Sequence, residues 1–311
     1  MNVRIEDGRL MVTVDETRDG RLMLGFLRKE LFFSRAKISS VKFDSSGILL
    51  NGAPVTVRTV LHTGDVLSVR IMDSDKREEH LIPAKMPLRI LYEDENLIAV
   101  DKPAGTVCHP SRGHAADSLA SALAGRFQEK QPEARVHLLG RLDKETSGIV
   151  LCAKNGFAAD RVRGSVEKEY VAIAEGRFSE TEGRITLPMK EQRDDTGILR
   201  MVSAADGKDA VTEYRVIGYA DGYTVLRVRP LTGRTHQIRF HMAAAGHPLL
   251  GDRMYGSASE QIGRCALHAA KLCFKKPFSE EKIRLQAAPP EDMAVLIGRC
   301  RTVFSEVEGE R

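Results

Sequence analysis

The chain has 311 residues, of which 42% are hydrophobic and 29% charged, a composition typical of globular proteins with a sizeable core. No apolar run approaches the roughly 20 residues that a membrane-spanning helix needs, and the polar N-terminus lacks the apolar segment of a secretory signal. We therefore expect a cytoplasmic protein, with two domains as the simplest division of this length.

The formal net charge is +4, and the basic residues gather in two clusters. Residues 20–42 hold one acidic residue, Glu30, against six basic ones: Arg21, Arg28, Lys29, Arg35, Lys37 and Lys42. Residues 227–239 hold four arginines and no acid. Two separate basic clusters favour a polyanion that touches the protein at two sites, with a solvated basic face as the alternative.

The N-terminal part begins with residues 1–14, which read as one strand. Apolar residues at helical spacing predict a helix over 21–31, and Ser34 is a good N-cap for a second helix over 35–42. Asn51-Gly52, after the apolar residues 48–50, is a strong turn signal, and two strands are predicted over 55–57 and 65–71 with a turn at 64–65 between them.

Three short motifs of this part, Ser34-Arg35, Asn51-Gly52 and Gly64-Asp65-Val66, resemble an S4 RNA-binding module. The resemblance implies that Arg35 and Lys37 meet RNA phosphates through their charges. Residues 73–87 are highly charged and carry two prolines, as linkers often do. We expect an S4-like domain over 1–75, a linker over 76–87 and a catalytic domain over 88–311.

The second part alternates strands and helices. The predicted strands cover 88–92, 97–100, 149–153, 167–173, 211–217 and 223–229, with a hairpin inside 184–202. The predicted helices cover 117–127, 155–166 and a segment that starts at Thr235 as N-cap and stops at Gly246. The clean polar–apolar alternation of 211–217 and 223–229 indicates half-buried antiparallel strands, so we expect an α+β fold.

Residues 137–153, HLLGRLDKETSGIVLCA, place Asp143 in a short loop before a buried strand. Arg141 and Lys144 flank Asp143, and nearby positive charge favours the anionic form of a carboxylate. The plain alternative is a turn in which Asp143 is a helix cap or an ion-pair partner.

The pattern R-L-D-x-x-T-S-G at 141–148 resembles the signature of the RluA-type pseudouridine synthases. Three further stretches continue the resemblance: Asp101-Lys102-Pro103-Ala104-Gly105, Lys168-x-Tyr170, and TGRTHQIR at 232–239. The chain departs from the family at Gly140 and Lys276, where the family usually has histidine.

This resemblance implies a mixed, largely antiparallel sheet with flanking helices, and isomerisation of uridine to pseudouridine in ribosomal or transfer RNA. Asp143 would be the essential carboxylate, Arg239 its ion-pair partner and Tyr170 the residue against the flipped base. Arg141 would fill the vacancy left in the RNA stack. Arg234 and His236 would contact the RNA, and a monomer is expected.

Other chemistries are weakly supported by the sequence. His236 and His241 lie five residues apart, which does not place them on one helical face as zinc ligands, so we expect no metal. No phosphate-binding glycine motif indicates a nucleotide cofactor. The five cysteines are scattered, and Cys108-His109 adjacency does not make a catalytic pair. A non-catalytic RNA-binding protein and a metal-dependent hydrolase remain as alternatives.

Overall fold

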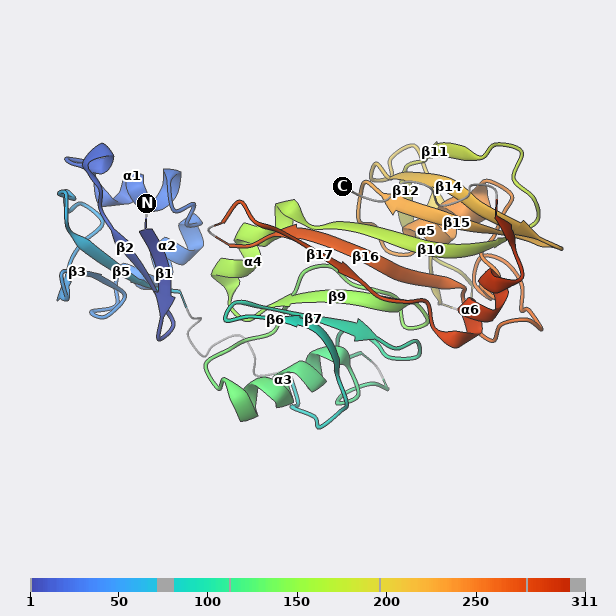
Figure 1. The fold of residues 1–311 in the computed structure, drawn as a ribbon, viewed down its shortest axis with the longest axis horizontal. Coiled ribbons are helices and arrows are strands. Elements are labelled where there is room, and N and C mark those ends of the chain that lie inside the picture. The colour runs from blue at the N-terminus through green and yellow to red at the C-terminus, as the bar shows by residue number, and fades with distance from the viewer. Residues whose placement is uncertain (1, 72–80, 112, 196, 278, 303–311) are drawn as a thin grey trace.

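The computed structural model describes residues 2–71, 81–111, 113–195, 197–277 and 279–302. Figure 1 shows a small sheet with two helices at one end of the molecule and a long, twisted sheet that forms the rest. The predicted linker lies partly among residues 72–80, which are outside the described ones, and 81–87 carry no helix or strand. No helix in the described part is long and apolar enough to cross a membrane.

The small sheet has the strand order β1-β2-β5-β3-β4. Its strands are β1 (Asn2–Glu6), β2 (Arg9–Thr13), β3 (Ile48–Leu50), β4 (Ala53–Pro54) and β5 (Val66–Arg70). The 3-10 helix η1 (Glu16–Arg18) precedes α1 (Met23–Lys29) and α2 (Arg35–Val41), which pack apolar side chains on the sheet. Ser34 caps α2 as predicted, since its side chain accepts a hydrogen bond from the Lys37 N–H.

Two predicted strands of this part were wrong. Residues 2–13 form a hairpin, not part of one strand, because Asp7 and Gly8 take positive φ angles of 46° and 72° and turn the chain. The strand predicted at 55–57 is instead the short β4, because the Asn51-Gly52 turn pairs Leu50 directly with Ala53.

The long sheet follows the order β11-β14-β15-β10-β16-β9-β7-β6, with β17, β18 and β8 attached beside it. All of its pairings are antiparallel except that between β16 and β9. The strands are β6 (Arg89–Glu93), β7 (Leu97–Lys102), β8 (His137–Leu138), β9 (Ser147–Ala153), β10 (Glu167–Glu175), β11 (Glu182–Thr186), β14 (Val211–Ala220), β15 (Tyr223–Pro230), β16 (Leu267–Lys275), β17 (Lys282–Gln286) and β18 (Arg301–Thr302). The predicted mixed, largely antiparallel sheet is confirmed.

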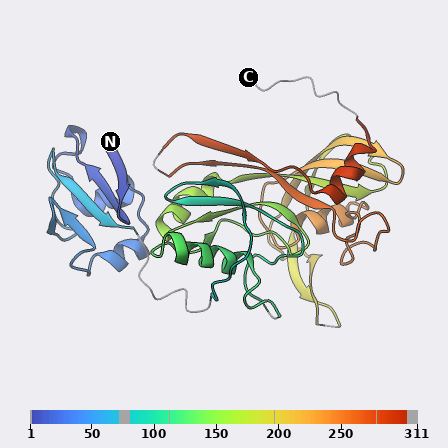
Figure 2. The ribbon, with the colours of Figure 1, turned by 60° about the horizontal axis from the view of Figure 1, so that its bottom comes forward.

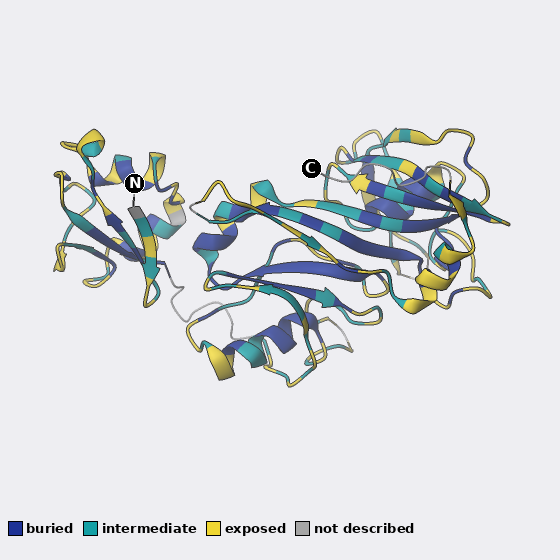
Figure 3. Ribbon diagram, in the orientation of Figure 1, coloured by how far each residue is buried: buried dark blue, intermediate teal, exposed yellow. Residues whose placement is uncertain are grey.

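Helices and one hairpin surround this sheet. The helices are α3 (Leu119–Lys130), α4 (Gly156–Val162), the 3-10 turn η3 (Arg163–Ser165), α5 (Gln237–Ala244) and α6 (Glu291–Gly298). The predicted hairpin is present as β12 (Met189–Arg193) and β13 (Leu199–Ser203), and Figure 2 shows it projecting from the body of the molecule. Every residue of β9 is buried, as the dark colour along that strand shows (Figure 3), so the loop before it starts from a rigid base.

Candidate active site

A pocket of about 740 Å3 opens at the start of β9. Most of its wall comes from four segments that are distant in sequence: residues 107–111, the loop over 139–146, the first half of β10, and residues 230–239. Of the predicted site residues, the pocket brings together Asp143, Arg239, Tyr170, Arg141, Arg234 and His236.

The loop that carries Asp143 is held by its backbone. The Lys102 ammonium is fully buried and donates to the carbonyls of Pro103, Thr106 and Lys144, with N–O distances of 2.9, 2.8 and 3.2 Å. Cys108 binds the backbone of Leu142, and Arg264 donates to the Glu145 carbonyl at 3.2 Å. These contacts leave the Asp143 side chain, 26% exposed, directed into the pocket.

Two positions near this loop favour glycine because of close contacts and a positive φ. Gly148 has φ +112°, and a Cβ there would lie 2.4 Å from the Ala269 carbonyl oxygen, where β16 runs parallel to β9. Gly140, the departure from the family pattern, has φ +95°, a conformation that favours glycine, and a Cβ there would lie 3.1 Å from the Lys168 Nζ.

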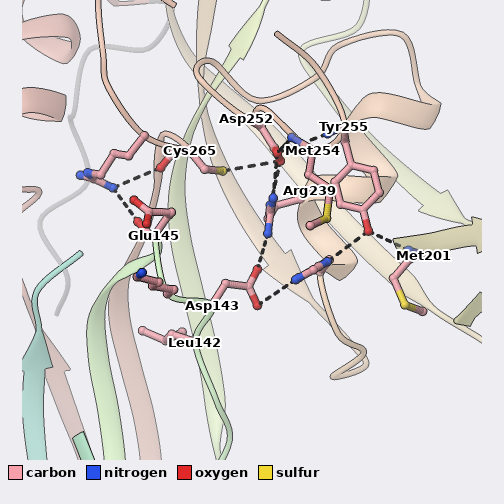
Figure 4. A network of polar contacts seen from close by, with 12 residues as sticks. Leu142, Asp143, Glu145, Met201, Arg239, Asp252, Met254, Tyr255 and Cys265 are labelled. Carbon is pink, nitrogen blue, oxygen red and sulfur yellow. Dashed lines mark hydrogen bonds and ion pairs between the residues drawn. The ribbon is translucent and has the colours of Figure 1, made fainter. Parts of the chain in front are cut away.

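Asp143 and Arg239 meet in an ion pair, although 96 residues separate them (Figure 4). The Arg239 Nη1 donates to the Asp143 Oδ2 at 3.2 Å. The other side of the guanidinium binds Asp252 through two hydrogen bonds, Nε to Oδ2 at 2.7 Å and Nη2 to Oδ1 at 2.8 Å. Because the forked Asp252 contact fixes the plane of the guanidinium, its remaining nitrogen is aimed at Asp143.

Burial and charge act in opposite directions on this pair. Burial opposes the charged form of Arg239, but the hydrogen bonds and charge of Asp252 outweigh it, so the pKa of Arg239 is raised. Burial likewise opposes ionisation of Asp252, whose side chain is fully buried, yet the contact with Arg239 lowers the pKa of Asp252. The result is a fixed positive charge beside Asp143.

The segment before α5 differs from its prediction at one residue. Thr235 is not the N-cap; His236 takes that position with a left-handed φ of 53° and makes no side-chain cap hydrogen bond. Gln237 organises the turn instead, because its Oε1 accepts from the Thr232 hydroxyl at 2.8 Å and from the Arg234 N–H at 3.0 Å. The predicted stop at Gly246 is confirmed by its φ of +83° after the helix.

His236 lies between Asp143 and Tyr255. Its Nε2 is 3.9 Å from the Asp143 Oδ1, and its Nδ1 is 3.1 Å from the Tyr255 hydroxyl. The same hydroxyl accepts from the Met201 N–H at 2.8 Å, which links the site to the projecting hairpin. Burial lowers the pKa of His236 against the opposing charge of Asp143, so the imidazole is neutral near pH 7.

Tyr170 stands on β10, at a register shift in its pairing with β16. The side chain is 7% exposed and belongs to the main apolar cluster, and it also lines the pocket. Burial, reinforced by the charge of Asp143, raises the pKa of Tyr170, so its hydroxyl keeps its proton. A neutral ring in the pocket wall suits stacking on a planar base.

The remaining predicted contacts lie farther out. Arg141 and Arg234 are exposed at the pocket, and the Arg234 Nε donates to the Asp209 carbonyl at 3.0 Å. Arg35 and Lys37 belong to α2, which Figure 1 places at the opposite end of the molecule from α5. Arg35 lines a separate hollow there with Leu24, Arg28, Ile38, Ser39 and Lys42.

Sequence reasoning missed three residues of this site: Lys102, Asp252 and Tyr255. Asp252 and Tyr255 lie in the segment that follows α5. Their roles depend on how residues 252–255 return to α5, and no local pattern shows that. His241 and His268 are each occupied by contacts inside the core, to Thr212 and Leu187 and to Ser147 and Ala287 respectively.

Comparison with known proteins shows the family of this chain. Residues 96–244 match the family described as RNA pseudouridylate synthase. An uncharacterised RNA pseudouridine synthase of Bacillus subtilis, YjbO, is 38% identical over 273 residues, which cover 86% of this chain and 95% of that protein. The ribosomal large subunit pseudouridine synthase D of Xanthomonas campestris is 35% identical over 88% of this chain and 87% of its own length.

The solved structures show the same fold. The human RNA pseudouridylate synthase domain containing 1 matches 71% of this chain and 91% of its own with a TM-score of 0.58, at 24% identity. The relatives match over nearly their whole length, so the likeness extends well beyond a shared motif. The chain belongs to the RNA pseudouridine synthases of the RluA type.

Proposed function

We propose that Asp143, Arg239 and Tyr170 carry out the isomerisation of uridine to pseudouridine in this protein. The observation that carries the assignment is the 3.2 Å contact between the Arg239 Nη1 and the Asp143 Oδ2, at the floor of a pocket walled by Tyr170. Among the described residues that line the pocket, Asp143 carries the only carboxylate.

The reaction breaks the bond from C1′ to N1, turns the base and joins C1′ to C5. The Asp143 carboxylate attacks C1′ or removes a sugar proton, and Arg239 keeps its negative charge in place. Tyr170 stacks on the base or hydrogen-bonds to it. The base must leave the RNA stack to enter the pocket, and Arg141 at the mouth would occupy the vacancy.

The RNA is held at more than one place in this proposal. Arg234 and His236 contact it at the pocket. The N-terminal residues 1–75 form an S4-like domain whose Arg35 and Lys37 meet phosphates at a distance, joined by the linker 76–87 to the catalytic domain 88–311. By analogy with the relatives named for the large ribosomal subunit, the substrate class is ribosomal RNA, acted on by a monomer in the cytoplasm.

Tritium release tests the proposal, because formation of the C1′–C5 bond expels the hydrogen at C5. The protein is incubated with [5-³H]uridine-labelled transcripts of large-subunit ribosomal RNA, and of transfer RNA for comparison. We expect release to reach a small whole number of sites on the ribosomal transcript, with pseudouridine at those positions. Tight binding with no tritium released from either RNA would leave a non-catalytic RNA-binding protein.

A further inference from the structure

Two buried histidines near the site have the same arrangement of partners. The Nε2 of His241 faces the Leu187 carbonyl at 3.2 Å, and that of His268 faces the Ala287 carbonyl at 3.0 Å. A carbonyl only accepts, so in both rings Nε2 carries the proton. Each Nδ1 then accepts from a hydroxyl, of Thr212 for His241 and of Ser147 for His268, at 2.9 Å in both cases.

His236 repeats this arrangement with the Asp143 carboxylate in the place of the carbonyl. The Tyr255 hydroxyl receives the Met201 N–H at 2.8 Å, so its own proton needs another acceptor. Among the described residues the acceptor within reach is the His236 Nδ1, at 3.1 Å. The proton of the imidazole therefore lies on Nε2, which faces the Asp143 Oδ1 at 3.9 Å.

We propose that His236 is a positioning residue that donates from Nε2 to the Asp143 Oδ1 when substrate closes the site, and that Tyr255 sets its tautomer. The proposal rests on the proposed function of Asp143. Arg239 holds one carboxylate oxygen and His236 holds the other, so the plane of the carboxylate is fixed from two sides. The present 3.9 Å is long for a hydrogen bond, and such contacts commonly tighten in the substrate complex.

The backbone gives independent support. His236 has a φ of 53°, a left-handed conformation that residues other than glycine seldom adopt. Its side chain is only 17% exposed, so it is held inside the site. The charged groups that face it are Asp143 and Arg141 from the loop, Arg239 from α5 and Asp252 from the segment after α5.

Two amide variants separate this role from a structural one. Glutamine at 236 places an N–H donor near the former Nε2, whereas asparagine fits the left-handed backbone better but reaches only to the former Nδ1. At saturating RNA, where a change in RNA affinity does not enter the rate, we expect His236→Gln to keep single-turnover activity within about tenfold of the parent and His236→Asn to lose about 100-fold. The opposite ranking, with asparagine the more active, would overturn the proposal.

The tautomer can be measured without any RNA. In ¹⁵N-histidine-labelled protein, the imidazole nitrogen shifts of His236, assigned by its absence in His236→Gln, should report a proton on Nε2. Tyr255→Phe keeps the ring but removes the hydroxyl, so the proton should redistribute to Nδ1 and the rate should fall. Tyr92→Phe, whose hydroxyl binds Asp94 away from the pocket, is the matched control and should change neither.

Failure of this inference and failure of the proposed function give different experimental results. A proton found on Nδ1 of His236 in the parent protein would overturn this inference and leave the isomerase intact. An absence of tritium release, with the proton on Nε2, would instead remove the proposed function while the hydrogen-bond pattern stood.

Discussion

Asp252, Arg239 and Asp143 form a series of ion pairs in which each residue orients the one after it. The Asp252 carboxylate accepts backbone hydrogen bonds from Met254 and Tyr255 at 3.0 and 3.3 Å. These bonds hold Asp252 in the orientation in which it binds Arg239. Arg239 then presents its third nitrogen to Asp143. The motifs at 141–148 and 232–239 predicted Asp143 and Arg239, but Asp252 was not predicted because its contact with Arg239 is fixed only by tertiary folding.

Removing the charge of Asp252 should therefore impair the function of Asp143, with which Asp252 is linked only through Arg239. Asp252→Asn breaks a buried ion pair, which costs about 3 kcal/mol of unfolding free energy, and frees the guanidinium to rotate. We expect single-turnover activity to fall about 100-fold while RNA binding is kept, measured by tritium release and filter binding. Full activity in a folded variant would mean that Arg239 does not need this anchor.

The buried histidines predict how stability depends on pH. Burial lowers the pKa of His236, His241 and His268 below their ordinary value of 6.5. Below pH 6.5 the unfolded chain therefore binds protons that the folded chain does not, so stability is full above that pH and is lost as the pH falls. The urea midpoint should drop clearly between pH 7.5 and 5.5; an unchanged midpoint would contradict neutral, buried rings.

At the scale of elements, local sequence predicted strands and helices better than their pairing. The buried run after Ser147 and the alternating strands over 211–229 were readable because their periodicity reflects which face is covered. The Asp7-Gly8 turn carries a hairpin signal in the sequence, whereas no local pattern marks His236 as the start of α5. Tertiary contacts impose that backbone conformation.

Gly148 gives a test of how closely β9 and β16 must approach. Gly148→Ala introduces a methyl group 2.4 Å from the Ala269 carbonyl oxygen at a φ of +112°, so the strands must separate. We expect a loss of about 3 kcal/mol in unfolding free energy, read from urea denaturation, together with lower activity because Asp143 sits on the preceding loop. Gly164→Ala, where a Cβ meets nothing within 4 Å, is the control and should be nearly neutral.

At the scale of the whole molecule, the loop between α1 and α2 of the N-terminal part packs on α4 through a few defined contacts. The rings of Phe33 and Phe157 pack at a tilt of 38° with centroids 4.2 Å apart, and the Arg161 Nη2 donates to the Leu31 carbonyl at 2.8 Å. Arg161 also lies 5.0 Å from the centre of the Phe32 ring. These contacts join residues more than 100 positions apart, so composition and periodicity do not reveal them. The distribution of arginine and lysine did indicate the two basic regions.

Loss of these contacts should weaken the binding of long RNA and leave the rate of the chemical step unchanged. Phe157→Ala removes a buried ring, which costs about 3 kcal/mol, and loosens the N-terminal part. We expect the KM for a ribosomal transcript to rise while kcat changes little, because the pocket residues are untouched. Phe43→Ala, at a ring that is 84% exposed, is the stability control and should unfold like the parent. An unchanged KM in Phe157→Ala would mean that the N-terminal part contributes nothing to RNA binding.

The most direct test of the whole account is single-turnover tritium release by Asp143→Asn beside Asp160→Asn, which alters an exposed aspartate on α4. Asparagine keeps the size of the side chain and removes its charge. We predict that Asp143→Asn folds, binds the ribosomal transcript with the parent affinity and releases no tritium, while Asp160→Asn matches the parent. Tritium release by Asp143→Asn at the parent rate would contradict the assignment of Asp143 as the essential carboxylate.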